Sequence, residues 1–118
     1  MALHNDFGKK GEGMAAEWLV QKGYRIIRRN WRHGRYEVDI IALLDEVWHF
    51  IEVKSAQTTL YGHPEEKVDK KKIRNLMKAA SAWLHQFPGC KRVQYDVLSI
   101  TIPGGAQPEY FLIQDVSL

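Results

Sequence analysis

Apolar residues recur at two different spacings along the chain, and the longer spacing predicts two helices. The clearer helix covers residues 67–87 and ends at Pro88-Gly89. Its apolar side chains repeat every three or four positions, at Ile73, Leu76, Met77, Ala80, Trp83 and Leu84. A second helix is predicted over residues 9–22, with Gly23 as its C-terminal cap, because glycine readily adopts the left-handed conformation found there. Residues 1–8 are expected to form a loose terminus.

The shorter spacing and the β-branched and aromatic residues predict five strands. They cover residues 24–31, 38–44, 47–54, 93–102 and 110–116. Only Asp45 and Glu46 separate the second strand from the third, which predicts a β-hairpin with a two-residue loop. The order α-β-β-β-α-β-β indicates an α/β protein. A chain of 118 residues has room for one core only, so a single domain over residues 1–118 is expected.

The predicted hairpin brings two carboxylates together on a largely apolar sheet. With a two-residue loop, Ile41 pairs with Phe50, and Asp39 pairs with Glu52 one step further on the same face. Directly opposed residues lie about 5 Å apart, and two like charges there repel by roughly 3 kcal/mol at an effective dielectric of 20. The apolar neighbours favour a partly desolvated patch, where this repulsion needs compensation.

A cation would provide that compensation. Lys54, which pairs with Glu37 in the same register, could offset part of the repulsion. A divalent ion between Asp39 and Glu52 would convert the repulsion into coordination, and carboxylates without clustered imidazoles or thiolates favour Mg²⁺ or Mn²⁺. The alternative is an ordinary network of cross-strand charges at an exposed strand end.

The first helix adds a further carboxylate. Glu12 shares a helical face with Ala15 and Leu19, so a helix packed on the sheet would point it inward. The alternative is a first-turn glutamate that is favoured only by the helix dipole. Gly11 and Gly13 flank it; they weaken the helix by up to about 1 kcal/mol each but allow the helix backbone to approach a neighbouring group closely.

Charge and composition narrow the class of protein. The net charge of +3 permits a nucleic-acid partner without requiring one. Basic residues form two groups along the chain. These groups are either ordinary solvated charges or a surface that binds the phosphates of a nucleic-acid backbone. The first comprises Arg25, Arg28, Arg29, Arg32 and Arg35, and the second Lys67, Lys70, Lys71, Lys72, Arg74 and Lys78. A single cysteine excludes an internal disulfide and a thiolate metal cluster. Without an apolar run of about 20 residues or a leader, we expect a cytoplasmic protein and no membrane partner.

An acidic residue on one strand followed by Glu-x-Lys on the next is the pattern of the PD-(D/E)XK nuclease superfamily. Here the pattern is Asp39 followed by Glu52-Val53-Lys54. The wider set of matching segments comprises Gly8-x-x-Gly11-Glu12-x-x-Ala15, Arg29-Asn30, Glu37-Val38-Asp39-Ile40-Ile41-Ala42, Phe50-Ile51-Glu52-Val53-Lys54 and Tyr95-Asp96-Val97. Together they resemble the YraN-like family of small, endonuclease-like bacterial proteins. The chain is also similar to archaeal Holliday-junction resolvases.

The resemblance implies a restriction-endonuclease-like fold, with a mixed central β-sheet flanked by helices, and metal-dependent hydrolysis of phosphodiester bonds. It implies that Asp39, Glu52 and the backbone carbonyl of Val53 hold Mg²⁺ or Mn²⁺, and that Glu12 completes the metal site directly or through water. Lys54 would position or deprotonate the attacking water, or stabilise developing charge. Glu37 and Lys72 would either hold the metal ligands in place or contact a phosphate. The expected nucleic-acid contacts are Arg28, Arg29, Arg32, Arg35, Lys71 and Lys72.

Two positions depart from the family pattern. Tyr36 stands where glycine is usual, and its bulk could narrow the approach to the site; Val38 replaces the proline that names the superfamily. The leading hypothesis is an endonuclease acting on structured or branched DNA. The alternative is a nucleic-acid-binding module that keeps the nuclease fold without turnover. A third reading is a protein-interaction domain, in which the strand at residues 110–113 pairs with a second copy to form a homodimer.

Overall fold

The computed structural model describes residues 3–56, 69–102 and 107–117, apart from the side chains of residues 3–8. Its order, α-β-β-β-α-β-β, is the predicted one. The elements are α1 (Leu3–Gln21), β1 (Arg25–His33), β2 (Tyr36–Leu44), β3 (Val47–Ala56), α2 (Lys70–Gln86), β4 (Val93–Thr101) and β5 (Glu109–Ile113).

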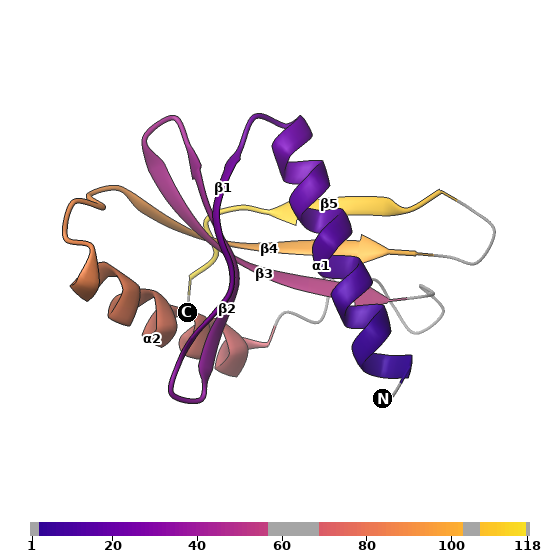
Figure 1. Cartoon of the computed structure of the whole chain (residues 1–118), viewed down its shortest axis with the longest axis horizontal. Helices are drawn as coiled ribbons and strands as arrows, with labels where there is room; N and C mark the ends of the chain where they lie inside the picture. The colour runs from indigo at the N-terminus through magenta and orange to yellow at the C-terminus, as the bar shows by residue number, and fades with distance from the viewer. Residues whose placement is uncertain (1–2, 57–68, 103–106, 118) are drawn as a thin grey trace.

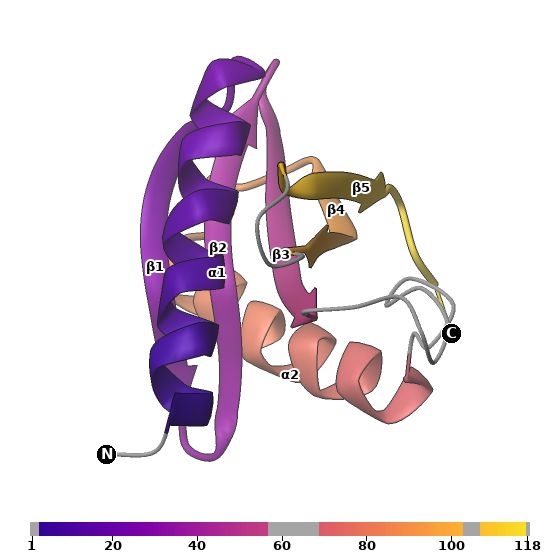
Figure 2. The ribbon, with the colours of Figure 1, turned by 90° about the vertical axis from the view of Figure 1, so that its right-hand side faces the viewer.

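The five strands form one sheet in the order β1-β2-β3-β4-β5. The β3–β4 pair is parallel and the other three pairs are antiparallel, so the sheet is mixed. The parallel pair requires a crossover, and α2 supplies it. Figures 1 and 2 show α1 and α2 on opposite faces of the sheet. The predicted mixed sheet flanked by helices is confirmed, and it is consistent with a restriction-endonuclease-like fold.

Each face of the sheet has its own hydrophobic core. On the α1 face the buried residues are Ala15, Ala16, Leu19, Tyr24, Ile40, Ala42, Ile51, Leu98 and Ile100. On the α2 face they are Val38, Ile41, Phe50, Leu76, Ala79, Ala80 and Trp83. Apolar residues on both faces of β2 and β3 explain why the hairpin sequence is apolar at consecutive positions instead of alternating.

Both ends of α1 are informative. The helix begins at Leu3, so residues 3–8, which the sequence predicted as a loose terminus, extend it; the cost of their single glycine is small beside two further turns of hydrogen bonds. At the other end Gly23 has φ +97°, its amide donates to Val20, and the amide of Tyr24 donates to Leu19. This is a Schellman motif, so the predicted glycine cap is confirmed.

The start of α2 is capped by Asp69, whose side chain accepts a hydrogen bond from the Lys71 amide at 2.8 Å. The helix had been predicted to begin at residue 67, and residues 67 and 68 lie outside the described part of the chain. The helix ends at Gln86, one residue before its predicted end.

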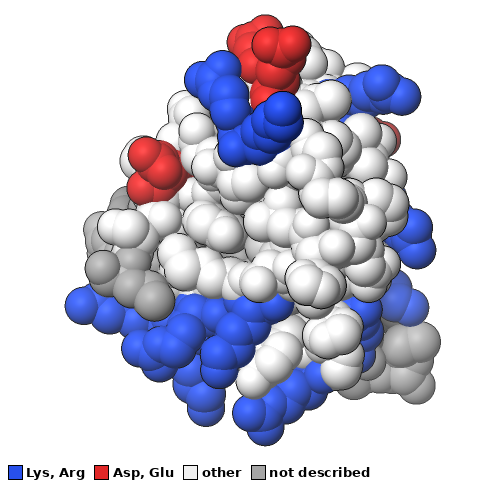
Figure 3. All heavy atoms as spheres, turned by 90° about the vertical axis from the view of Figure 1, so that its left-hand side faces the viewer, with Lys and Arg blue, Asp and Glu red and all other residues white. Residues whose placement is uncertain are grey.

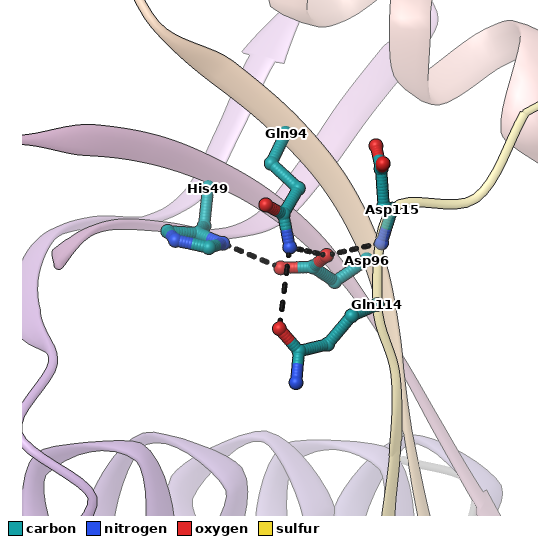
Figure 4. A network of polar contacts seen from close by, with 5 residues as sticks. All are labelled: His49, Gln94, Asp96, Gln114 and Asp115. Carbon is teal, nitrogen blue, oxygen red and sulfur yellow. Dashed lines mark hydrogen bonds and ion pairs between the residues drawn. The ribbon is translucent and has the colours of Figure 1, made fainter. Parts of the chain in front are cut away.

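A buried polar network joins the C-terminal segment to the sheet (Figure 4). The carboxylate of Asp96, fully buried in β4, lies 2.7 Å from His49 Nδ1. It also accepts hydrogen bonds from Gln94 Nε2 and from the backbone amide of Asp115, each at 2.9 Å. Asp115 adopts φ +57°, which turns the chain out of the sheet. For this reason β5 ends at Ile113, three residues earlier than predicted.

Candidate active site where β2 and β3 part

The predicted hairpin register is confirmed near the loop and fails further along. Asp45 and Glu46 have φ +50° and +67°, as in a two-residue type I′ turn. The paired positions run from Leu44–Val47 to Ile40–Ile51 as the sequence predicted, and there the ladder ends.

Beyond Ile40, the side chain of Asp39 takes the place of a strand partner. Its Oδ2 atom accepts a hydrogen bond from the backbone amide of Val53 at 2.8 Å. A buried amide must find an acceptor, and here a carboxylate on β2 supplies it, so the two strands can separate without leaving that amide unpaired. Asp39 of β2 and Val53 of β3, with Glu52 beside it, therefore lie at the point where the two strands part.

The pairings predicted beyond that point are therefore wrong. Asp39 does not pair with Glu52 in the ladder, and Glu37 does not pair with Lys54. Nor do Val38 and Val53 share a face: Val38 packs in the α2-side core and Val53 against the α1-side core.

The physical cause is a local break in strand alternation. Residues two apart should share a face, yet Val38 and Ile40 belong to opposite cores. Opposite this point, Asn30 of β1 adopts φ +53°, between the pairs Arg29–Ile40 and Trp31–Val38. The β1–β2 ribbon is twisted here, and its side chains change faces.

Asp39 is the most perturbed acid of the site. Burial raises its pKa from the ordinary value of 3.8 to about 7; the hydrogen bond from Val53 lowers it, and the nearby carboxylates of Glu12, Glu37 and Glu52 raise it further. A carboxyl group with this pKa has an unusually high affinity for a proton, and by the same electrostatics for a cation. The carboxylates that the sequence grouped are thus brought together, although not by the ladder pairing.

Glu52 is placed between that acidic group and two lysines. Burial raises its pKa, Lys72 and Lys54 lower it, and Asp69 raises it. Its Oε2 atom is buried and, among the described residues, has no hydrogen-bond partner. A buried carboxylate oxygen without a donor is costly, so this atom is available to bind a ligand.

Glu12 reaches the site from α1, as predicted. Burial raises its pKa, as does Glu37, whereas a hydrogen bond from Asn30 and the charge of Arg29 lower it. The preceding Gly11 lets the helix approach β3 closely, since a Cβ atom there would lie 2.7 Å from Ser55 Oγ. The expectation that these glycines allow close backbone approach is confirmed at Gly11.

The donor set fits a hard divalent cation. Asp39 and Glu52 offer carboxylate oxygens, and one of these oxygens lacks a donor. In residues 3–56, 69–102 and 107–117, no three His, Cys, Asp or Glu side chains converge into a ready-made metal cluster. The two carboxylates by themselves suit Mg²⁺ or Mn²⁺, since Mg²⁺ commonly takes one or two carboxylates and keeps several waters. Ligation by Glu12 and by the Val53 carbonyl stays a prediction.

Comparison with known proteins places the chain in a family. Residues 11–100 match the model of the uncharacterised protein family UPF0102. The chain belongs to this family. The YraN-like resemblance seen in the sequence is thereby confirmed.

Several UPF0102 relatives align over most of their own length. The UPF0102 protein of Phocaeicola vulgatus is 42% identical over 85% of this chain and 83% of the relative. That of Prosthecochloris aestuarii is 43% identical over 86% and 81%, and that of Leifsonia xyli subsp. xyli is 38% identical over 92% and 93%. The family is thus defined over the whole region that carries the site.

Basic side chains of this UPF0102 protein surround the acidic group. Arg29 lies near Glu12 and Lys72 near Glu52, while Arg32 Nε forms a 3.1 Å ion pair with Glu37. Figure 3 shows many Lys and Arg along the lower part of one face, and others at its top beside acidic residues. Arg28 is exposed on β1, opposite Ile41 in the register.

In the described segments no helix is both long and apolar enough to cross a membrane.

Arg35 and Lys71 take part in a feature that the sequence did not predict. Together with Tyr36 and Asn75 they line a pocket of about 250 Å³ between the β1–β2 loop and α2. The ring of Tyr36 lies against Lys78 of α2. Whether its bulk also narrows the approach to the acidic site stays a prediction. The spacing of Lys71, Asn75 and Lys78 places them on one helical face, a signal that was present in the sequence.

Proposed function

We propose that this UPF0102 protein is a metal-dependent endonuclease that hydrolyses phosphodiester bonds in nucleic acid, with structured or branched DNA as its expected substrate. The observation that carries the proposal is the position of Asp39. Its carboxylate is held by the Val53 amide, close to Glu12, Glu37 and Glu52, where β2 and β3 part. Because they are buried and carry like charges, these carboxylates destabilise one another without a cation, and a bound cation would relieve the repulsion.

Asp39 and Glu52 would hold Mg²⁺ or Mn²⁺, with the Val53 carbonyl and, directly or through water, Glu12. When bound, such an ion supplies charge stabilisation at the phosphate and lowers the pKa of a coordinated water. The hydrogen bond from Val53 fixes one Asp39 oxygen, which leaves the other to bind a ligand. The bound ion would also give a partner to the Oε2 atom of Glu52, which has no hydrogen-bond partner among the described residues.

Lys54 would act on the attacking water or on the charge that develops at phosphorus. It follows Glu52 by two residues on β3, so both side chains leave the strand on the same face. Its charge also acts on Glu52. Lys72, on the first turn of α2, also acts on Glu52 and would contact a neighbouring phosphate. Glu37 would hold Arg32 in place through their ion pair.

The acidic group is what favours an enzyme over a binding module. A surface that only binds a polyanion gains nothing from carboxylates in its middle, because they repel phosphates. Four acidic side chains that act on one another, inside a rim of Arg and Lys, fit a site where a cation joins protein and phosphate. The binding module remains the alternative, favoured by the basic rim itself.

The deciding experiment is cleavage of a substrate panel with Mg²⁺ or Mn²⁺: duplex, single-stranded, flapped and four-way DNA, and structured RNA. Wild type is compared with Asp39→Asn, Lys54→Met and, as a matched carboxylate control, Glu46→Gln in the hairpin loop. We expect products with wild type and Glu46→Gln, and none with the other two or with chelator. Cleavage retained by folded Lys54→Met would reject the role of that lysine. Salt-sensitive binding without products from any substrate would favour the binding module.

A homodimer and a cytoplasmic location also remain expectations. β5 is an edge of the sheet, and its Phe111 is 54% exposed, which are the properties expected of a strand that pairs with a second copy. Light scattering on wild type and Phe111→Lys tests this directly. A monomer mass for wild type at working concentration would exclude the dimer.

A further inference from the structure

The pocket between the β1–β2 loop and α2 is built from hydrogen-bond donors. Among the residues that the structure describes, those that line it are Arg35 and Tyr36 from the hairpin and Lys71 and Asn75 from the helix. Two of these are cations, two are neutral groups that can donate, and none is a carboxylate. At about 250 Å³ the pocket lies just below the usual size of small-molecule sites, roughly 300–1,000 Å³, so it suits a small polar anion.

Tyr36 is oriented as a donor by its two cationic neighbours. Arg35 Nη2 donates to the Tyr36 hydroxyl oxygen at 3.2 Å, and the ammonium group of Lys78 acts on the same hydroxyl. Both cations also lie over the ring, each 5.3 Å from its centroid. With its oxygen already accepting from Arg35, the hydroxyl can donate its proton to a further partner, and an anion is the partner that benefits. Arg35 and Lys78 both lower the pKa of Tyr36, as expected for a hydroxyl polarised in this way.

The pocket adjoins the acidic site through two pairs of consecutive residues. On β2, Tyr36 lines the pocket and Glu37 acts on Asp39. On α2, Lys71 lines the pocket and Lys72 acts on Glu52. Consecutive Cα atoms are about 3.8 Å apart, so the segments that line the pocket continue directly into those that carry the acidic site. A strand with one phosphate at the carboxylates would bring an adjacent phosphate to the pocket.

We propose that this pocket binds a phosphate group of the nucleic-acid strand next to the one positioned at Asp39 and Glu52. The proposal rests on the proposed function for the identity of the ligand, and on the pocket itself for its anionic chemistry. Arg35 and Lys71 supply charge, while Tyr36 and Asn75 supply directed hydrogen bonds. The phosphate is an internal phosphodiester or a terminal monoester, and the experiment separates the two.

Binding is measured in chelator, so that cleavage plays no part. Fluorescence anisotropy gives the Kd of wild type, Tyr36→Phe and Asn75→Asp for one oligonucleotide with and without a 5′-phosphate. Tyr36→Phe removes only the hydroxyl, and Asn75→Asp places a negative charge in the pocket without changing shape. Tyr110→Phe is the matched control, because that ring stacks on Trp18 in α1, away from the pocket. Amide shifts of Tyr36 and Asn75 on titration with inorganic phosphate report the pocket directly.

We expect Tyr36→Phe to raise the Kd by about tenfold, since a hydrogen bond to a charged group is lost, and Asn75→Asp to raise it more. Tyr110→Phe should match wild type. A gain in affinity from the 5′-phosphate that Asn75→Asp abolishes identifies a terminal monoester. Equal losses for both oligonucleotides identify an internal phosphate.

Unchanged Kd values in both pocket variants, with no amide shifts at Tyr36 or Asn75 in phosphate, would overturn the proposal. Cleavage assays on the same proteins keep the two proposals apart. Metal-dependent cleavage alongside unchanged binding would reject the pocket and retain the nuclease. Phosphate binding at the pocket with no cleavage of any substrate would retain the pocket and reject the nuclease.

Discussion

Asp39 Oδ2 accepts a hydrogen bond from the Val53 amide at 2.8 Å, and this contact joins the two strands at the point where their ladder ends. The same carboxyl group therefore has a structural role and an electrostatic one. As an acceptor it stabilises the hairpin, whereas its negative charge, buried near three other carboxylates, destabilises it. The two roles can be separated by substitution.

Replacing Asp39 with asparagine should stabilise the folded protein at pH 8 in chelator. The pKa of Asp39 is about 7 in the folded protein and near 3.8 when unfolded, so the folded state binds more protons in between. The contribution of Asp39 to the free energy of unfolding is therefore greatest below pH 4. It falls as the pH rises towards 7, and stays low above pH 7. The difference corresponds to at most about 4 kcal/mol. Asparagine keeps an acceptor for Val53 without the charge.

Thermal unfolding of wild type and Asp39→Asn at pH 5 and pH 8 measures this effect. The gain in Tm from the substitution should be larger at pH 8 than at pH 5. Asp39→Ala, which removes the acceptor as well, should be less stable than Asp39→Asn at both pH values. A gain that is equal at the two pH values would show that the charge of Asp39 is not the cause.

Addition of Mn²⁺ or Mg²⁺ should raise the Tm of wild type at pH 8. A ligand that binds only the folded state stabilises it by about 1.4 kcal/mol when present at ten times its Kd. Glu52→Gln should lose most of this rise, because the oxygen without a hydrogen-bond donor is replaced by a neutral group. Glu46→Gln, at the hairpin loop, should keep it. Equal rises in all three proteins would place the ion elsewhere.

The hairpin shows how far sequence reasoning reaches. Its turn and first five pairs were predictable, because loop length and apolar pattern are local properties of the chain. The register failed beyond Ile40 because the Asp39 side chain bonds to a backbone amide, and no periodicity records such a bond. The sequence still indicated that Asp39 and Glu52 lie close together, because the motif places both residues where β2 and β3 part.

The pocket at Tyr36 could not have been predicted in the same way. It exists because the twisted β1–β2 ribbon brings its loop against α2, a tertiary contact between elements more than 30 positions apart in the sequence. The helical spacing of Lys71, Asn75 and Lys78 was visible, but nothing local indicated which element they would face. Sequence patterns placed residues on faces, and only the fold showed which faces meet.

Gly11→Ala should destabilise the protein and displace Glu12. The added Cβ would lie 2.7 Å from Ser55 Oγ and 3.0 Å from Ser55 Cβ, so α1 must move away from β3. Overpacking of this kind costs about 1–3 kcal/mol. Gly13→Ala is the matched control, since its Cβ would meet only Arg29 Nη2 at 4.0 Å, and alanine favours the helix by up to about 1 kcal/mol. Urea unfolding should move in opposite directions for the two variants, and a stabilised Gly11→Ala would contradict the close contact.

Asp96→Asn should be strongly destabilising although Asp96 is remote from the chemistry. The carboxylate is fully buried and accepts from Gln94, from the Asp115 amide and at His49 Nδ1. An amide has one oxygen instead of two, so either the donors at Gln94 and Asp115 face an NH₂ group, or His49 must change tautomer to accept from it. A donor left unpaired costs about 1–3 kcal/mol.

The matched control is Asp115→Asn, because there only the backbone amide takes part and asparagine tolerates the left-handed conformation at φ +57°. We expect Asp115→Asn to unfold like wild type. In Asp96→Asn, amide hydrogen exchange should quicken at the end of β5 and at Asp115, because the bond that fastens the C-terminal segment to β4 is weakened. Unchanged exchange there, with stability lost uniformly, would show that Asp96 supports the core in general and does not hold that segment.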